Sequence, residues 1–353
     1  MGRLIVAYCL TMGVTTALCA LWLRRNPAWR RLLLTTALVA IALAGGASAL
    51  GKSLFPTARL LGYGVFVFLP AHLALAAWLC RKGGGWQLRA PALLAATLAL
   101  AGLDAYWIEP HWLQVTHHRI ESAKVRQPFR IAVLSDLQAD VFGDFERNAL
   151  RRALAEKPDV IVLTGDYIQA ETGAQWEALA AQIHAYLREI DFAAPLGVYA
   201  VGGNTDFTAW PLLFEGLPVT TFEETASIDA GRFTLTGLSS LDSMRPRLRV
   251  PGRQDFHIVI GHSPNFALGS VDADLLVAGH THGGQIRLPW IGPLETLSRV
   301  PRAWAAGVTK LPDGGVLAVS RGVGMVRLEA PRVRFLCRPE VMILDVVAPA
   351  ETP

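Results

Sequence analysis

The sequence predicts an α/β domain that follows an N-terminal transmembrane helical region. Three observations support this prediction. The chain of 353 residues is 52% hydrophobic and only 18% charged, whereas soluble proteins carry roughly 25% charged residues. Four long apolar stretches open the chain. From about residue 113 onward, short β-rich runs alternate with helical segments, which is typical of an α/β domain with largely parallel strands.

The apolar stretches are each about 17 to 20 residues long and contain no Lys or Arg, which suits a crossing of about 30 Å of hydrocarbon. They are Leu4–Leu23, Leu32–Leu50, Leu60–Leu79 and Pro91–Ile108. Tryptophans stand at their ends, where indoles favour the membrane interface. The alternative, a soluble bundle of buried helices, requires four helices with almost no polar face. We therefore expect residues 1–112 to form a four-span transmembrane anchor of the cell membrane.

Charge is distributed unevenly along the chain. The first 110 residues hold ten Lys and Arg but only two acids, so the remainder carries 23 basic and 27 acidic residues. An acidic domain argues against a nucleic-acid partner, because polyphosphate binding needs a basic track. Seven basic residues lie in the first and third loops of the anchor, whereas only three lie in the N-terminus and the second loop. The positive-inside rule then predicts that the C-terminal domain is extracytoplasmic.

Residues 113–353 are predicted to form one domain. Its β-rich runs are predicted at 130–136, 159–166, 197–204, 233–238, 257–262 and 274–280, and its helices at about 143–156 and 174–190. Several of the apolar runs end in a polar residue of a metal-binding type. These residues are Asp136, Gln138, Asp166, Asn204, His262, His280 and His282.

Taken singly, each of these residues has an ordinary structural explanation. An Asp after a strand commonly caps a helix or makes a turn, and a lone His is commonly a core side chain. Taken together they indicate one site, because the carboxyl ends of parallel strands meet at one edge of a sheet. Mixed carboxylate, amide and imidazole ligands suit borderline divalent ions. The pattern therefore predicts a divalent metal site.

The motifs SDLQ, TGDY, GNTD, GHSP and AGHTHGGQ, in this order, resemble the calcineurin-like metallophosphoesterases, and in particular a membrane-associated subgroup of phosphodiesterases. The resemblance runs from about Phe129 to Val347. It implies a four-layer α/β/β/α sandwich that holds two divalent ions, of Mn, Fe, Zn or Mg. The first ion would take Asp136, Asp166 and His282, and the second would take Asp166, Asn204, His262 and His280. The catalytic positions of the family fall on Asn204, Thr205 and His262.

Two positions depart from the family pattern. Gln138 stands where the family has a His ligand, so we expect a weakened first metal site. Thr205 replaces a His that helps to stabilise the transferring phosphoryl group. A Thr hydroxyl donates a hydrogen bond but is no general acid near neutral pH. This loss matters least for an acidic leaving group, so we expect a diphosphate or an activated diester as substrate.

The resemblance implies a membrane-anchored hydrolase that cleaves a phosphodiester or pyrophosphate bond of a lipid or lipid-linked substrate with metal-activated water. A UDP-2,3-diacylglucosamine-type substrate is one example, but it is cytoplasmic and conflicts with the outward orientation. An outer-leaflet phospholipid or a polyprenyl-type phosphate fits that orientation better. The alternative is a catalytically weakened module that binds metal or phospholipid at the membrane.

Overall fold

The computed structural model describes residues 2–25, 27–83 and 85–349, so residues 1, 26 and 84 of the expected anchor and residues 350–353 of the expected domain lie outside it. The chain divides into two compact units. One unit contains the helices up to Ile108 together with the short segment Arg327–Arg332. The other unit begins at Glu109 and contains the remaining residues.

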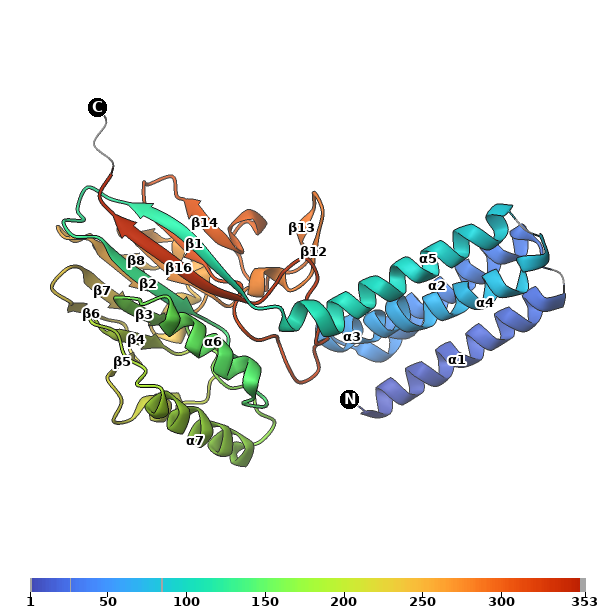
Figure 1. Ribbon diagram of the computed structural model, residues 1–353, viewed down its shortest axis with the longest axis horizontal. Coiled ribbons are helices and arrows are strands. Elements are labelled where there is room, and N and C mark those ends of the chain that lie inside the picture. The colour runs from blue at the N-terminus through green and yellow to red at the C-terminus, as the bar shows by residue number, and fades with distance from the viewer. Residues whose placement is uncertain (1, 26, 84, 350–353) are drawn as a thin grey trace. The chain divides into compact units, whose positions relative to one another are not determined.

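The described part of the first unit up to Ile108 is built of helices (Figure 1). Its elements are α1 (Gly2–Arg25), α2 (Trp29–Gly51), α3 (Leu54–Tyr63), the π-helical η1 (Gly64–Phe68), α4 (Leu69–Leu79), the 3₁₀ turn η2 (Arg81–Gly83), α5 (Gly85–Leu103) and the π-helical η3 (Asp104–Ile108). Four helical stretches are long and apolar enough to cross a membrane, namely 2–25, 29–51, 54–79 and 89–111. They contain the four apolar stretches predicted from the sequence.

The third of these stretches changes its helical geometry in the middle. The π-helical turn η1 connects α3 to α4, and Pro70 stands in the first turn of α4. Proline has no N–H to donate to the carbonyl four residues earlier, so a widened turn is the local consequence. Because the helix axis continues through this turn, residues 54–79 still form one stretch of 26 residues.

The second unit contains two six-stranded sheets (Figure 1). The first sheet has the spatial order β1 (Gln114–Glu121), β16 (Glu340–Val347), β2 (Phe129–Leu134), β3 (Val160–Leu163), β4 (Val198–Val201) and β5 (Val219–Phe222). The second has the order β14 (Gly307–Lys310), β15 (Val316–Val319), β11 (Leu275–Ala278), β9 (His257–Ile260), β7 (Thr234–Gly237) and β6 (Ala226–Asp229). Two short ribbons complete the strands, β8 (Arg249–Val250) with β10 (Ser270–Val271), and β12 (Arg287–Leu288) with β13 (Gly292–Pro293).

The central strands of both sheets are parallel, and they are the apolar runs that the sequence singles out. In the first sheet β2, β3, β4 and β5 pair in parallel, with the helices α6 (Asp144–Ala155) and α7 (Gly173–Glu189) between successive strands of the chain. In the second sheet β7, β9, β11 and β15 pair in parallel. The antiparallel pairs are β16 with β2, β14 with β15, and β6 with β7.

The two sheets pack face to face around a common apolar core, which includes Val133, Val162, Leu235, Ile258 and Val277. Helices α6 and α7 cover the other face of the first sheet. Short helical segments and loops cover the outer face of the second sheet. These segments are α8 (Ser240–Ser243), η6 (Pro264–Leu268) and η8 (Arg302–Trp304). The layers therefore follow the order α/β/β/α, with a thin outer layer.

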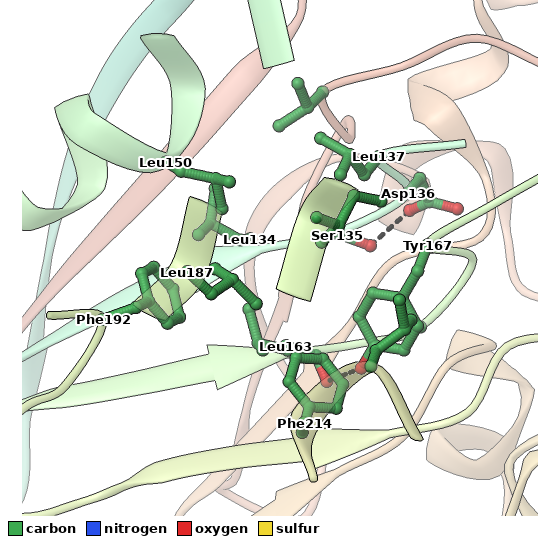
Figure 2. Close-up of a pocket in the computed structure, with 14 residues that line it drawn as sticks. Leu134, Ser135, Asp136, Leu137, Leu150, Leu163, Tyr167, Leu187, Phe192 and Phe214 are labelled. Carbon is green, nitrogen blue, oxygen red and sulfur yellow. Dashed lines mark hydrogen bonds between the residues drawn. The ribbon is translucent and has the colours of Figure 1, made fainter. Parts of the chain in front are cut away.

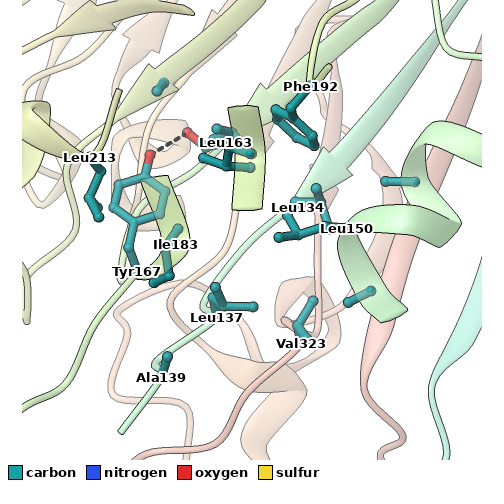
Figure 3. Packing of buried hydrophobic residues seen from close by; sticks show 14 of the residues in the cluster. Leu134, Leu137, Ala139, Leu150, Leu163, Tyr167, Ile183, Phe192, Leu213 and Val323 are labelled. Carbon is teal, nitrogen blue, oxygen red and sulfur yellow. Dashed lines mark hydrogen bonds between the residues drawn. The ribbon is translucent and has the colours of Figure 1, made fainter. Parts of the chain in front are cut away.

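The core between α6, α7 and the first sheet lies directly behind the carboxyl ends of β2 and β3. It encloses a cavity of about 30 Å³, and Figure 2 shows Leu134, Leu163, Phe192 and Phe214 around it, with Asp136 at its edge. Because its walls are almost wholly apolar, it has room for a water molecule but offers few partners for one. Figure 3 shows the surrounding side chains packed from both layers. The site therefore rests on a well-packed apolar base.

Candidate metal centre

The seven residues predicted as metal ligands come from both sheets. Asp136, Asp166 and Asn204 follow β2, β3 and β4 of the first sheet, at their carboxyl ends. His262 follows β9 of the second sheet, and His280 and His282 follow β11. Because the two sheets face each other, these ends meet at one edge of the sandwich. Asp136, Asp166 and His262 each offer a ligand atom, and the three atoms lie within 4.8 Å of one another.

The backbone at the site adopts an uncommon conformation. Five of the seven residues have a positive φ: Asp136 (49°), Gln138 (39°), Asp166 (55°), His280 (68°) and His282 (49°). Residues other than glycine seldom adopt this left-handed region, and where they do the surrounding structure holds them there. Each strand therefore turns sharply where it ends, so that the side chain is directed across the edge of the sheet.

Two glycines allow the chain to pass close to the carboxylates. A Cβ atom on Gly203 would lie 2.1 Å from Asp166 Oδ1, and a Cβ atom on Gly279 would lie 2.4 Å from Asp136 Oδ2. Both separations are far below any real contact of a Cβ atom. The glycines of the GNTD and AGHTHGGQ motifs therefore make the space in which the two carboxylates lie.

Four acceptor atoms converge on His262. Its Nε2 lies 2.9 Å from Asn204 Oδ1, 3.2 Å from His280 Nδ1 and 3.5 Å from Asp166 Oδ1. Its other ring nitrogen, Nδ1, is 2.8 Å from the carbonyl oxygen of Thr164. A carbonyl only accepts hydrogen bonds, so this contact places the proton of a neutral ring on Nδ1 and leaves a lone pair on Nε2.

The same reasoning fixes the tautomer of His280. Its Nε2 lies 3.2 Å from the carbonyl oxygen of Leu297, which assigns the proton to Nε2 and the lone pair to Nδ1. Burial and the neighbouring His262 lower the pKa of His280, so the ring is neutral near pH 7. Two imidazole lone pairs, an amide oxygen and a carboxylate oxygen then face one another. Such a set of donors fits a divalent metal ion.

Asp136 and His282 form the second half of the cluster. His282 Nε2 lies 3.4 Å from Asp136 Oδ1, and both side chains are buried. Asp136 also accepts hydrogen bonds from the hydroxyl of Ser135 and from the backbone N–H of His280. Burial, and then the charge of Asp166, raise the pKa of the Asp136 carboxyl to about 7. A bound cation would reverse this shift, since it favours the ionised form.

Gln138 and Thr205, the two departures from the family pattern, both lie at the site. The side-chain amide of Gln138 is 3.0 Å from Asp166 Oδ2 and donates to it. The backbone N–H of Thr205 donates to Asp166 Oδ1 at 2.8 Å. The hydroxyl of Thr205 is buried and has no hydrogen-bond partner among the described residues. Both residues therefore adjoin the carboxylate that the resemblance assigns to the two metals in common.

Sequence reasoning missed part of what positions Asp166. The carboxylate of Asp206 accepts three backbone N–H groups, those of Asp166, Tyr167 and Gly203, each at 2.8 Å. It thereby ties the end of β3 to the turn after β4. The Asp in GNTD signals a turn, but nothing in the sequence indicates its bonds to residues 40 positions earlier.

A buried arginine supports the other side of the site. Arg334 is fully buried, and its guanidinium donates to the carbonyl oxygens of Arg321, Gly322, Gly324 and Cys337. The loop that it holds donates in turn to Asp136, whose carbonyl accepts the N–H of Gly324 at 2.7 Å. Arg321 itself pairs with Glu340 at 3.0 Å. Arg334 is therefore a structural cation behind the carboxylates.

The sandwich of two mixed sheets gathers carboxylates, an amide and imidazoles at one edge, and this set of side chains suits a divalent metal ion. Comparison with known proteins gives the class, a metal-dependent phosphoester hydrolase. Residues 129–284 match the calcineurin-like phosphoesterase family, and the chain therefore carries a calcineurin-like phosphoesterase domain.

Three relatives illustrate the similarity. The uncharacterized metallophosphoesterase YkuE of Bacillus subtilis is 29% identical over 278 residues, which cover 72% of this chain and 93% of the relative. Phosphodiesterase YaeI of Escherichia coli is 27% identical over 281 residues, which cover 72% and 96%. UDP-2,3-diacylglucosamine pyrophosphatase LpxG of Chlamydia trachomatis is 23% identical over 328 residues, which also cover 72% and 96%.

Proposed function

We propose that this protein is a membrane-anchored two-metal phosphoesterase that hydrolyses a phosphodiester or pyrophosphate bond of a lipid or lipid-linked substrate. Residues 1–112 would anchor it, and residues 113–353 would carry the reaction. One observation carries the proposal: the lone pairs of His262 and His280 and the oxygens of Asn204 and Asp166 converge on one point, and each ring is oriented by a backbone carbonyl.

The chain offers ligands for two ions. Asp136 and His282, 3.4 Å apart, would hold the first ion with Asp166 and Gln138, and Asp166 would be shared with the second ion, held by Asn204, His262 and His280. Bound divalent ions supply a Lewis acid that polarises the phosphoryl group and activates water for attack. The residues of the chain position the ions and the substrate. Asn204 is exposed while His262 is buried, so the second ion would be open to a substrate on the side of Asn204.

Thr205 is our candidate for contacting the phosphoryl group, because it takes the position of the His that stabilises this group in the family. Its buried hydroxyl has no other partner among the described residues, and it is adjacent to the ligand Asn204. It can donate a hydrogen bond to a phosphoryl oxygen, but it cannot protonate a poor leaving group. This favours a pyrophosphate or an activated diester over an alkyl monoester. Faster turnover of a monoester than of a diester would contradict this preference.

Two observations favour a lipid or lipid-linked substrate. Four helical stretches are suited to a membrane, and they would keep the domain at a bilayer surface where such substrates are concentrated. One relative is named as a pyrophosphatase of UDP-2,3-diacylglucosamine. The distribution of basic residues favours an extracytoplasmic domain, for which a phospholipid or polyprenyl-type phosphate is the better substrate. A reporter fused to the C-terminus, active on only one side of the membrane, distinguishes the two orientations.

The experiment that tests the proposal combines metal analysis with hydrolysis of bis-p-nitrophenyl phosphate by the full chain in detergent. The wild type is compared with Asp166→Asn and Gln138→His. We expect bound divalent metal and turnover in the wild type and the loss of both in Asp166→Asn. A wild-type protein that binds metal but hydrolyses no diester, pyrophosphate or lipid-linked phosphate would refute the enzymatic function.

A second candidate is a metal- or phospholipid-binding module with little turnover. The specific observation in its favour is the bond from the Gln138 amide to Asp166 Oδ2, because a donor then faces an oxygen that the first ion would need. This candidate predicts fewer than two ions per wild-type chain. It also predicts that Gln138→His, which restores an imidazole, raises both the metal content and the turnover.

A further inference from the structure

An exposed apolar loop extends from the metal centre. Strands β12 and β13 form a tight hairpin in which Arg287 pairs with Pro293 and Leu288 pairs with Gly292. Its tip carries Trp290, which is 103% exposed, and Ile291, which is 58% exposed. The chain that follows adds Leu294 and Leu297, which are 43% and 46% exposed. We call residues 286–297 the apolar loop. Four large apolar side chains this exposed within eight residues indicate a surface that meets an apolar partner.

The loop is held firmly at its base. Arg287 N–H donates to the carbonyl of Phe335, and Phe335 N–H donates to the carbonyl of Gln285. The carboxylate of Glu295 accepts the N–H of Thr296 and the N–H of Leu297, both at 2.9 Å. The exposed tip is therefore presented by a fixed loop, so its apolar side chains cannot readily turn inward to avoid water.

The base of the loop lies at the edge where the chain enters the domain. Glu109 is the first residue of the second compact unit and follows directly on Ile108, the last helical residue of the first unit. Its carboxylate accepts the backbone N–H groups of Leu336 and Cys337. Leu336 is the neighbour of Phe335, which pairs with the loop. The last candidate membrane span includes residues 108 and 109, so the proposed membrane attachment joins the chain to the bilayer at this edge of the domain.

Other residues at this edge have the character of a membrane interface. Trp112 is 52% exposed, and the guanidinium of Arg338 lies 3.5 Å from the centre of its ring. Leu336 is also 52% exposed. The stretch 286–304 contains three arginines, Arg287, Arg299 and Arg302, but only one acidic residue, Glu295. Indole rings and arginines around an apolar tip complement the acyl chains and the anionic headgroups of a bilayer.

We infer that the apolar loop inserts into the surface of the bilayer as an additional contact beside the helical anchor. The loop also touches the candidate metal centre, since the carbonyl of Leu297 accepts the ring Nε2–H of His280 at 3.2 Å. An inserted loop therefore holds the site next to lipid headgroups. The inference rests on the proposed membrane attachment of the helices, but it does not depend on hydrolysis.

The test measures where the loop lies in a bilayer. The full chain, in a Cys9→Ser background, carries Trp290→Cys labelled with an environment-sensitive fluorophore. It is reconstituted into vesicles of phosphatidylethanolamine and phosphatidylglycerol and recovered by flotation. The matched control is Asp313→Cys, an exposed position in the turn before β15, at the opposite edge of the sandwich. Quenching is compared for a lipid with a doxyl group high on its acyl chain and for aqueous iodide.

If the inference is correct, the label at position 290 emits at shorter wavelength, is quenched by the doxyl lipid, and has a several-fold lower iodide quenching constant than the label at position 313. If both labels are quenched equally by iodide, the loop lies in water and the inference is wrong. It is also wrong if the label is shielded from both quenchers, because the loop then contacts a second copy of the chain. A protein that does not float would refute the membrane attachment itself, independently of any measurement of hydrolysis.

Discussion

Replacing Gly203 by alanine should dismantle the metal centre while leaving the fold intact. The φ of Gly203 is outside the left-handed range, so an alanine meets no backbone strain there. The added methyl group would instead lie 2.1 Å from Asp166 Oδ1 and 2.3 Å from the backbone nitrogen of Asp166. The substitution therefore acts directly on the carboxylate that is proposed to be shared by the two ions.

The size of the effect follows from these distances. Ordinary contact of a Cβ atom begins near 3.4 Å, so the carboxylate must move by about 1.3 Å. Metal–ligand distances tolerate only about 0.2 Å, and a misplacement of about 1 Å costs about 100-fold in rate. We therefore expect at least a 100-fold loss in kcat/KM and a loss of bound metal. The overpacking should lower the free energy of unfolding by only about 1 to 3 kcal/mol.

The assay pairs the metal content with the hydrolysis of bis-p-nitrophenyl phosphate, and thermal unfolding serves as the check on the fold. The control is Gly173→Ala at the start of α7, where a Cβ atom would meet nothing within 4 Å. Alanine there should leave the activity unchanged and raise the stability slightly, by about 0.5 to 1 kcal/mol. If Gly203→Ala retains both metal and activity, the glycine does not make space for the carboxylate and the reasoning fails.

Three further predictions concern Asp206, Asp136 and Arg334. Asp206→Ala should destabilise the protein by about 3 kcal/mol or more, because three backbone N–H groups lose their acceptor. Asp206→Asn should lower the free energy of unfolding by less than Asp206→Ala does. An Asp206→Ala variant that melts at the wild-type temperature would contradict the prediction. The metal-free protein should lose stability as the pH rises from 3.8 to about 7, because the native Asp136 keeps a proton that the unfolded chain has released. Urea unfolding at several pH values, without and with divalent metal, measures this dependence. A free energy of unfolding of the metal-free protein that stays constant or rises with pH would contradict the prediction. Arg334→Met should cost about 3 to 5 kcal/mol, since four carbonyls lose a buried guanidinium. Arg334→Lys should recover only part of this stability in thermal melts, because an ammonium group lacks the planar set of N–H donors of a guanidinium. Full recovery of the stability would show that the positive charge alone is sufficient.

The strands β2, β3, β4, β7, β9 and β11 could be predicted from the sequence because they are mostly buried, whereas the buried strands β15 and β16 lie after the last predicted run and were missed. The runs around β2, β3, β9 and β11 are rich in Val, Ile and Leu, and every residue of β3, β9 and β11 is buried. The edge strand β1 escaped prediction, since only one of its eight residues is buried and its sequence QVTHHRIE has no clear alternation. Its place is determined by β16, which pairs with it along its full length but lies more than 200 residues later.

The sequence selects a set of candidate residues for the site but not their geometry. Chemical type and position after a strand were enough to choose the candidate ligands, and the structure brings Asp136, Asp166 and His262 within 4.8 Å of one another. The orientation of the imidazoles depends on carbonyls of Thr164 and Leu297, which carry no sequence signal because every residue has a carbonyl. The positive φ of Asp136 and Asp166 could not be predicted from the sequence either, since glycine or asparagine is the more usual residue in such a conformation. Backbone preference alone therefore would not have located these turns in the sequence.

The left-handed backbone at five of the predicted ligands has a consequence for how this protein can change. Each such residue costs roughly 1 kcal/mol or more relative to glycine, against a typical total stability of about 5 to 15 kcal/mol. Glycine at these positions would relieve the strain and abolish the ligand together. A library screened for thermal tolerance alone should therefore enrich substitutions in the five ligands, and only a screen that also demands turnover would retain them.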